Sequence, residues 1–302
     1  MSLAGRDKAN MNAVALACPR QATVRGDKAP RPLAERLTDW KYVAARLVRR
    51  YLVPNRMLSL LPGYAVSQNE IEPCAIVDKY LDYLNRLKIN LSGARILEIG
   101  MGATNSTGYE LAARAPISYW LGYDPFSSFN RSLDRRILNI VADRRGLEPG
   151  VIAKRTKRLD RLDDLSPGSV DVILSHCVLE HVRRPEELFN ALAGLLISGG
   201  KMIHAVDYRD HYFRYPFHFL KFSDKTWRRW LDPGDLPRHR LFNHVDIING
   251  LGLNVEIIET RLDPDNFFRV EPWVRPVFKR GTPEDAAEWA VLAVTTGLTP
   301  ER

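Results

Sequence analysis

Two apolar runs in the second half of the sequence are each followed by side chains that can accept or donate a proton. His176 and His181 follow the first run, and Asp207 and His211 follow the second. Imidazole titrates close to neutral pH, so it can remove a proton from a hydroxyl group as that group reacts. We predict that His211 is the general base, that Asp207 orients it or a substrate hydroxyl, and that His181 is a further catalytic candidate.

A metal ion is the less favoured alternative at the same place. Asp207, His211 and one further ligand could hold a divalent ion, but their spacing matches no familiar ligand motif. We therefore expect no metal ion.

An earlier stretch carries residues suited to binding a nucleoside. Glu98, Gly100 and Gly102 follow one apolar run, and Asp124 and Pro125 follow the next. Glycine has no Cβ, so its backbone can approach a ligand closely, and an acid at a strand tip can accept hydrogen bonds from ribose hydroxyls. In open α/β sheets, nucleotide-like ligands bind outside the carboxyl ends of the strands. The pattern favours a nucleoside cofactor, and the alternative is an ordinary tight turn at both glycines.

The glycine spacing distinguishes two classes of nucleoside cofactor. A dinucleotide fold needs G-x-G-x-x-G, which places the pyrophosphate on a helix N-terminus. Asn105 stands where the third glycine would be, and Glu98 would put a negative charge beside the phosphates. A carboxylate there suits a zwitterionic amino-acid group better.

The runs around these residues predict an α/β fold. Short β-branched runs bounded by polar residues are typical of buried parallel strands. An amphipathic helix begins at Pro185, and we expect it to end at a glycine cap formed by Gly199 and Gly200. The expected strands in this half cover residues 151–156, 170–175, 201–206, 253–260 and 288–296.

At these residues the sequence resembles the class I S-adenosylmethionine-dependent methyltransferases, as a methyltransferase type 11-like domain. The E-x-G-x-G turn at Glu98 and the stretch from Asp171 to Val182, which ends in L-E-H-V, carry the resemblance in the right order. It extends from Ala94 to Thr296 and departs from the family at Thr104, where many members have another small residue or glycine. It implies a seven-stranded Rossmann-like sheet of order 3-2-1-4-5-7-6, with the last strand antiparallel and helices on both faces.

The resemblance also implies the cofactor and its ligands. S-adenosylmethionine would have Glu98 at its amino-acid end and Asp124 at its ribose. Its adenine would lie near one of three acids after the expected third strand, Asp160, Asp163 or Asp164. A histidine at the position of His181 more often shapes the pocket of such enzymes than carries protons. The expected cofactor-binding residues are Glu98, Gly100, Gly102, Thr104, Asp124, Pro125, Asp160, Ser175 and His176.

Composition and charge exclude several other functions. The 302 residues are 45% hydrophobic and carry a net charge of +8, with twelve basic and four acidic residues up to Arg56 and 32 of each after it. The main domain therefore has no general basic face, which argues against a nucleic-acid substrate. Three widely spaced cysteines suit a reducing compartment, and no apolar run approaches the length of a membrane span. We expect a cytoplasmic protein, and its oligomeric state stays open.

The charge distribution suggests three regions. We expect a disordered basic tail over residues 1–33, a helical cap over 34–90 and the methyltransferase domain over 91–302. The segment from Trp40 to Leu52 has an apolar stripe at helical spacing that includes Val43, Leu47 and Tyr51. This helix either packs on its own domain, which we favour, or lies weakly on an anionic membrane surface.

An aromatic insertion over residues 207–250, between the expected fifth and sixth strands, is where this superfamily builds its acceptor pocket. Its rings suit a planar or sugar acceptor, although they could equally form a plug that anchors the insertion. The insertion also resembles bacterial methyltransferases associated with surface-glycan or secondary-metabolite pathways. We predict methyl transfer to a small molecule, at a hydroxyl oxygen of a sugar or glycan precursor or a secondary metabolite, with nitrogen or carbon less favoured. The alternatives are a non-catalytic regulatory module that binds the same cofactor and, less favoured, an NAD-linked oxidoreductase.

Overall fold

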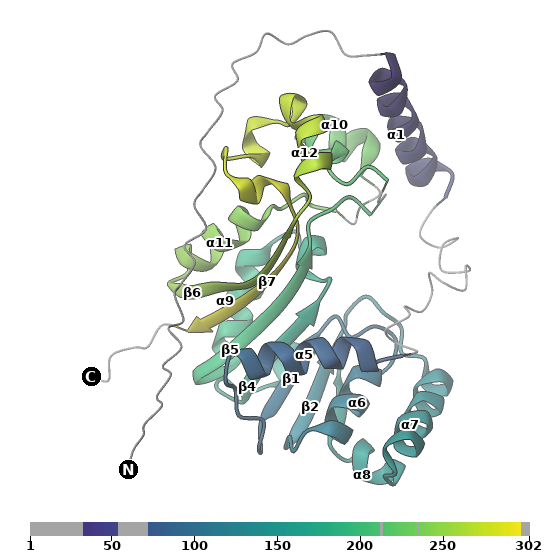
Figure 1. Ribbon diagram of the computed structural model, residues 1–302. Helices are drawn as coiled ribbons and strands as arrows, with labels where there is room; N and C mark the ends of the chain where they lie inside the picture. Colours follow the sequence, from purple (N-terminus) through teal and green to yellow (C-terminus); the bar gives the residue numbers. More distant parts are fainter. Residues whose placement is uncertain (1–32, 54–71, 212–213, 233, 235, 297–302) are drawn as a thin grey trace, which may run out of the picture.

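A seven-stranded sheet forms the centre of the molecule. The computed structural model describes residues 33–53, 72–211, 214–232, 234 and 236–296. The strand order is β3-β2-β1-β4-β5-β7-β6, and β7 is antiparallel to both of its neighbours, which confirms the predicted topology (Figure 1). The strands are β1 (Arg95–Ile99), β2 (Tyr119–Tyr123), β3 (Thr156–Leu159), β4 (Val170–His176), β5 (Leu196–Asp207), β6 (Leu253–Leu262) and β7 (Ala287–Thr296).

Helices cover both faces of the sheet because alternate residues of the central strands are apolar on each side. Ile96 of β1 packs in a core with α5, α6, α7 and α8, whereas its neighbour Leu97 packs in a second core with α9 and α11. The bounds are α5 (Cys74–Arg86), α6 (Ser106–Arg114), α7 (Arg131–Arg145), α8 (Pro149–Ala153), α9 (Pro185–Leu195), α11 (Leu241–Gly250) and α12 (Pro264–Val270). No helix in the described ranges is both long and apolar enough to cross a membrane.

Two predicted boundaries are wrong. The third strand begins at Thr156, because residues 149–153 form α8 with Pro149 in its first turn. The helix that begins at Pro185 ends at Leu195 and has no glycine cap, since Leu196 already pairs with Val170 of β4. Gly199 and Gly200 therefore lie inside β5, beside an irregularity in its pairing with β4.

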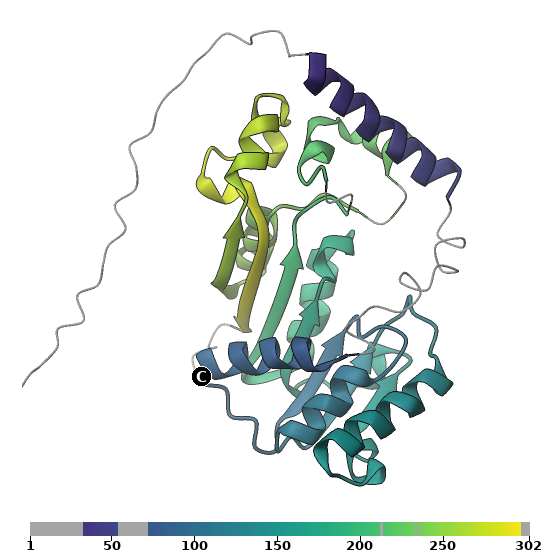
Figure 2. The ribbon, with the colours of Figure 1, turned by 45° about the vertical axis from the view of Figure 1, so that its right-hand side comes forward.

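The N-terminal helix α1 (Leu33–Tyr51) packs on the insertion that follows β5 (Figures 1 and 2). Its buried face carries Tyr42 and Arg46, whereas Trp40 is 67% exposed and Tyr51 is 53% exposed. The predicted apolar stripe therefore lies only partly on the packed face. Packing on the chain's own domain agrees with the favoured alternative, and contact with a membrane surface stays a prediction.

The insertion packs around its own aromatic residues. It contains η3 (His218–Lys221), α10 (Asp224–Thr226) and the π-helix η4 (Trp227–Leu231). Phe217, Phe219 and Trp227 are buried in a third core together with Tyr42 of α1, whereas Trp230 is 48% exposed. These buried rings act as a plug that anchors the insertion and α1 to each other. The predicted disordered tail lies outside the described residues except for Leu33, which is in α1, and the predicted domain limits stay a prediction.

Candidate functional site

The turn after β1 has the backbone conformation that its glycines predict. Gly100 and Gly102 have φ angles of +76° and +79°, a region that other residues rarely adopt. A Cβ on Gly100 would lie 2.3 Å from Cγ2 of Val178, in the loop after β4. The backbone at Gly100 therefore lies close to Val178 of the same protein and not to a ligand. This contact packs the loop after β1 against the loop after β4.

Asp124, directly after β2, holds the same turn by hydrogen bonds. One carboxylate oxygen accepts from the Gly102 N–H at 2.9 Å, and the other accepts from Phe126 N–H and Ser127 N–H, each at 2.9 Å. The Arg158 guanidinium donates to the carbonyls of Gly102 (2.8 Å) and Ser127 (2.9 Å). The carboxylate of Asp124 thus accepts three of the roughly four hydrogen bonds that it can accept. About one position is left to accept a hydrogen bond from a ligand hydroxyl.

A cavity of about 520 Å³ lies at this edge of the sheet and brings three predicted residues together. Asp124, Pro125 and Asp160 line it together with Phe129 and Arg158. This volume is in the range of pockets that bind small molecules. A cavity of about 540 Å³ under α1 is lined by none of the predicted site residues.

Three consecutive side chains at the turn after β1 have buried polar atoms without a partner in the part of the chain that the structure describes. The side-chain oxygens Thr104 Oγ1, Asn105 Oδ1 and Ser106 Oγ are buried and have no hydrogen-bond partner among the described residues. Buried polar groups normally have a partner, so three consecutive exceptions suggest that a ligand or water completes them. None of the three residues lines the cavity at Asp124 and Asp160, and the predicted part of Thr104 in cofactor binding stays a prediction.

Glu98 does not share that cavity with Asp124, so this part of the predicted geometry is wrong. Its carboxylate is buried on the α5 side of the sheet and accepts hydrogen bonds from Tyr80 Oη (3.2 Å) and Trp120 Nε1 (3.1 Å). Burial raises the pKa of Glu98 to about 8, although both hydrogen bonds act in the opposite direction. The side chain therefore braces α5 and β2 against β1.

Ser175 and His176, at the end of β4, also have partners inside the protein. The Ser175 hydroxyl is hydrogen-bonded to Nδ1 of His204 at 2.7 Å, deep in the core. The centroids of the His176 and Trp289 rings lie 5.1 Å apart. Burial, with a contribution from the charge of Lys79, lowers the pKa of His176 to about 4. Neither lines the cavity at Asp124, and their assignment to the cofactor stays a prediction.

Asp207 is held by its own neighbour Arg209. Its carboxylate accepts from Nε of Arg209 at 3.0 Å and from a terminal nitrogen of the same guanidinium at 2.7 Å. Asp207 is also nearly buried. Asp207 therefore forms an ion pair with Arg209 at the end of β5. Its role in catalysis stays a prediction.

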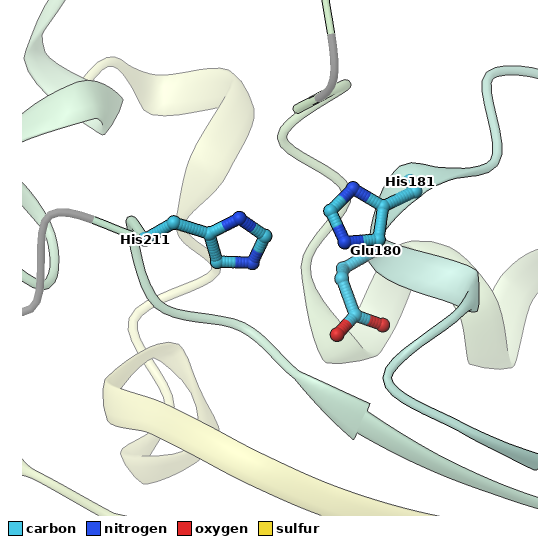
Figure 3. A group of neighbouring side chains, drawn as sticks. All are labelled: Glu180, His181 and His211. Carbon is cyan, nitrogen blue, oxygen red and sulfur yellow. The ribbon is translucent and has the colours of Figure 1, made fainter. Parts of the chain in front are cut away.

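The other two catalytic candidates come together, and Glu180 joins them (Figure 3). The rings of His181 and His211 lie 4.8 Å apart between centroids, one from the turn η2 (Leu179–His181) and the other from the loop after β5. One ligand-type atom from each of Glu180, His181 and His211 lies within 4.8 Å of the others. Burial raises the pKa of Glu180 to about 8. The sequence shows Glu180 directly before His181, but only the fold shows that it belongs to this group.

Arg158 is a second residue that sequence reasoning missed. It lies on β3 opposite Gly122 of β2, and its side chain reaches the turns after β1 and β2. An arginine in a short polar strand carries no sequence signal for this role, because the role depends on strand register.

The comparisons with known proteins agree with this fold. A family model described as a methyltransferase domain matches residues 70–254, which is more than half of the chain. A search of curated proteins found no match.

Two solved structures illustrate the likeness. One is a phosphoethanolamine N-methyltransferase 2 from Haemonchus contortus with phosphomonomethylethanolamine and S-adenosylhomocysteine, at 16% identity and a TM-score of 0.47, over 72% of this chain and 53% of that one. The other is an arsenic(III) S-adenosylmethionine methyltransferase from Chlamydomonas reinhardtii, at 16% identity and a TM-score of 0.47, over 70% of this chain and 66% of that one. The chain thus spans about half the length of the first relative and just under two thirds of the second.

Proposed function

This chain belongs to the family of S-adenosylmethionine-dependent methyltransferase domains, and we propose that it methylates a hydroxyl oxygen of a small molecule. When bound, S-adenosylmethionine supplies a methyl group on a positively charged sulfur that is a good leaving group. The chain's own residues must therefore bind the nucleoside, align the acceptor and take up its proton.

The cavity at Asp124 supports the binding part of this proposal. Asp124 and Asp160 offer acceptor oxygens to ribose and adenine, and Arg158 fixes the surrounding backbone. We assign Glu98 a structural role and not a role in cofactor binding, because its carboxylate already accepts hydrogen bonds within the core.

The pair of His181 and His211 is the observation that favours an oxygen acceptor. A hydroxyl must lose its proton as it attacks, whereas an amine or an activated carbon needs less help. Both imidazoles reach solvent at the carboxyl end of the sheet, where an acceptor can approach them. We propose His211 as the base and His181 as the group that orients the hydroxyl, in a sugar or glycan precursor or a secondary metabolite. A cytoplasmic location stays a prediction.

The acceptor class can be tested by turnover. The full-length protein is incubated with S-adenosylmethionine and with matched panels of sugar, phenolic and amine acceptors, and S-adenosylhomocysteine and the methylated product are measured. We expect methyl ethers from hydroxyl acceptors and loss of at least about 100-fold in turnover in His211→Ala, in line with general-base catalysis. N-methylated products alone, or full turnover in His211→Ala, would contradict the assignment.

Cofactor binding is tested separately by calorimetry with S-adenosylhomocysteine and with NAD. We expect the first to bind at about micromolar Kd and the second not to bind. Asp124→Asn should weaken S-adenosylhomocysteine binding about 10- to 100-fold, because it removes charge-assisted hydrogen bonds. Asp163→Asn, at an exposed side chain near the same edge of the sheet, is the matched control. Binding without turnover of any acceptor would favour the regulatory module, and NAD binding would favour the oxidoreductase.

A further inference from the structure

Glu180, His181 and His211 form a ligand set, of which the methyl-transfer assignment above uses only the two histidines. One carboxylate and two imidazoles come from two separate loops, and their ligand-type atoms lie within 4.8 Å of one another (Figure 3). In tetrahedral coordination, with bonds of about 2.1 Å, such atoms stand about 3.4 Å apart. Small side-chain rotations would therefore bring the three atoms to coordination distance.

The carboxylate of Glu180 is the second, independent observation. It is 3% exposed, and neither oxygen has a hydrogen-bond partner of normal geometry among the described residues. The nearest donors are its own backbone N–H, the backbone N–H of Asp207 and the Cys177 thiol, all outside normal hydrogen-bond geometry. A buried carboxylate is costly unless it is paired, protonated or bound to a metal ion.

The loop that carries Glu180 is held in a strained conformation. Cys177 has a φ of +55°, although it is not glycine, and its N–H donates to the carbonyl of Ala205 in β5 at 2.8 Å. Such backbone conformations cost about 1–3 kcal/mol and cluster at binding and catalytic sites. The hydrogen bond ties the loop of Glu180 and His181 to the strand that leads to His211.

We propose that Glu180, His181 and His211 bind one divalent transition-metal ion, such as Zn²⁺, Mn²⁺ or Fe²⁺, whose open positions take the acceptor hydroxyl. Two imidazoles and one carboxylate suit these ions, whereas Mg²⁺ and Ca²⁺ prefer sites made of oxygen alone. Three protein ligands leave positions free for water or substrate, as in catalytic sites. This proposal rests on the proposed function and changes one part of it: His181 and His211 would hold the ion, which would position the hydroxyl and lower its pKa, and the released proton would pass to solvent instead of to His211.

Metal binding is measured without any turnover. Tag-free full-length protein, stripped with a chelator, is titrated with Mn²⁺ under electron paramagnetic resonance and with Co²⁺ under visible absorption. We expect one ion per chain, and we expect Zn²⁺ to displace Mn²⁺ because Zn²⁺ forms the stronger complexes with nitrogen ligands. Absence of stoichiometric binding of all three ions would overturn the proposal.

The ligands are identified by variants. Glu180→Gln, His181→Ala and His211→Ala should each weaken Co²⁺ binding at least about tenfold. Glu186→Gln, at an exposed acid of α9, should leave it unchanged. Neither His181 nor His211 is buried, so these two variants report on the site even if Glu180→Gln fails to fold. Binding that survives all three substitutions would place the ion elsewhere and contradict the proposal.

S-adenosylhomocysteine calorimetry on the same samples separates this proposal from the proposed function. Stripped protein that binds S-adenosylhomocysteine and methylates a hydroxyl at full rate would overturn the metal site and leave the function standing. If S-adenosylhomocysteine does not bind but the three residues still bind one Co²⁺, the proposed function is overturned and the metal site stands.

Discussion

Arg46 and Asp210 form a buried ion pair that joins α1 to the residue directly before His211. Tyr42 of α1 donates a second hydrogen bond to the same carboxylate. Asp210 is fully buried, and the Arg46 guanidinium also lies 5.0 Å from the centre of the Trp227 ring. The N-terminal helix therefore fixes the start of the loop that brings His211 to His181, so α1 supports the position of the proposed base as well as the insertion.

Arg46→Met should destabilise the protein by about 3–5 kcal/mol. The substitution keeps the apolar stem but leaves the buried carboxylate of Asp210 without its cation, and such unpaired charges carry penalties of this size. Unfolding in urea measures the change. Lys41→Met, at an exposed position of the same helix, should stay within about 0.5 kcal/mol of the wild type. Equal losses in the two variants would mean that the pair does not hold α1 in place.

Glu98 should make the stability of the protein fall as the pH rises. Its folded pKa is about 8 and its unfolded value is near 4.5, so between these values the folded chain keeps a proton that the unfolded chain has lost. Its contribution to stability is complete below about pH 4.5 and is lost as the pH rises through about 8. Over this window the wild type should lose on the order of a few kcal/mol relative to Glu98→Gln, which does not titrate.

Thermal and urea unfolding of both proteins at pH 5 and pH 9 checks this difference. Glu256→Gln, at an exposed glutamate of β6, is the matched control and should follow the wild type. If the wild type and Glu98→Gln change in parallel with pH, Glu98 does not hold a proton in the folded state. The hydrogen bonds that Glu98 accepts from Tyr80 and Trp120 would then offset the effect of burial on its pKa.

Gly100→Ala should be far more disruptive than Gly146→Ala. Both glycines have positive φ, at +76° and +63°, so both alanines carry the cost of the left-handed region, about 1–2 kcal/mol. Only Gly100 also faces a side chain, because its Cβ would lie 2.3 Å from Val178, whereas nothing lies within 4 Å at Gly146.

The extra cost at Gly100 should be partly relieved by Val178→Ala. The double variant Gly100→Ala/Val178→Ala should be more stable than the sum of the single effects predicts, by about 0.5–3 kcal/mol, since neighbouring residues couple on this scale. The free energies of unfolding in urea of the wild type, the two single variants and the double variant give the coupling energy in a double-mutant cycle. Additive effects would show that the loops after β1 and β4 do not pack as described.

The sequence by itself determined the sheet and most of its strands. Apolar runs with β-branched residues, separated by helices of regular leucine spacing, leave few ways to bury both faces of a sheet. The order of the strands was implied by the resemblance that the E-x-G-x-G turn and the L-E-H-V stretch carry, and the topology β3-β2-β1-β4-β5-β7-β6 confirms it. A turn at Gly100 and Gly102 follows from the sequence as well, since a positive φ is a local property of the backbone, whereas their predicted part in cofactor binding stays a prediction.

Tertiary structure alone decided which way the polar side chains of those strands face. Glu98 and Asp124 both follow apolar runs, yet Glu98 hydrogen-bonds inward to Tyr80 and Trp120, while Asp124 lines the cavity. His211 meets His181 and Glu180, and Asp207 is held by Arg209, because loop packing rather than sequence distance sets those contacts. Local patterns fix the backbone of each element, but a side chain's partner depends on residues brought from far along the chain, which the patterns do not contain.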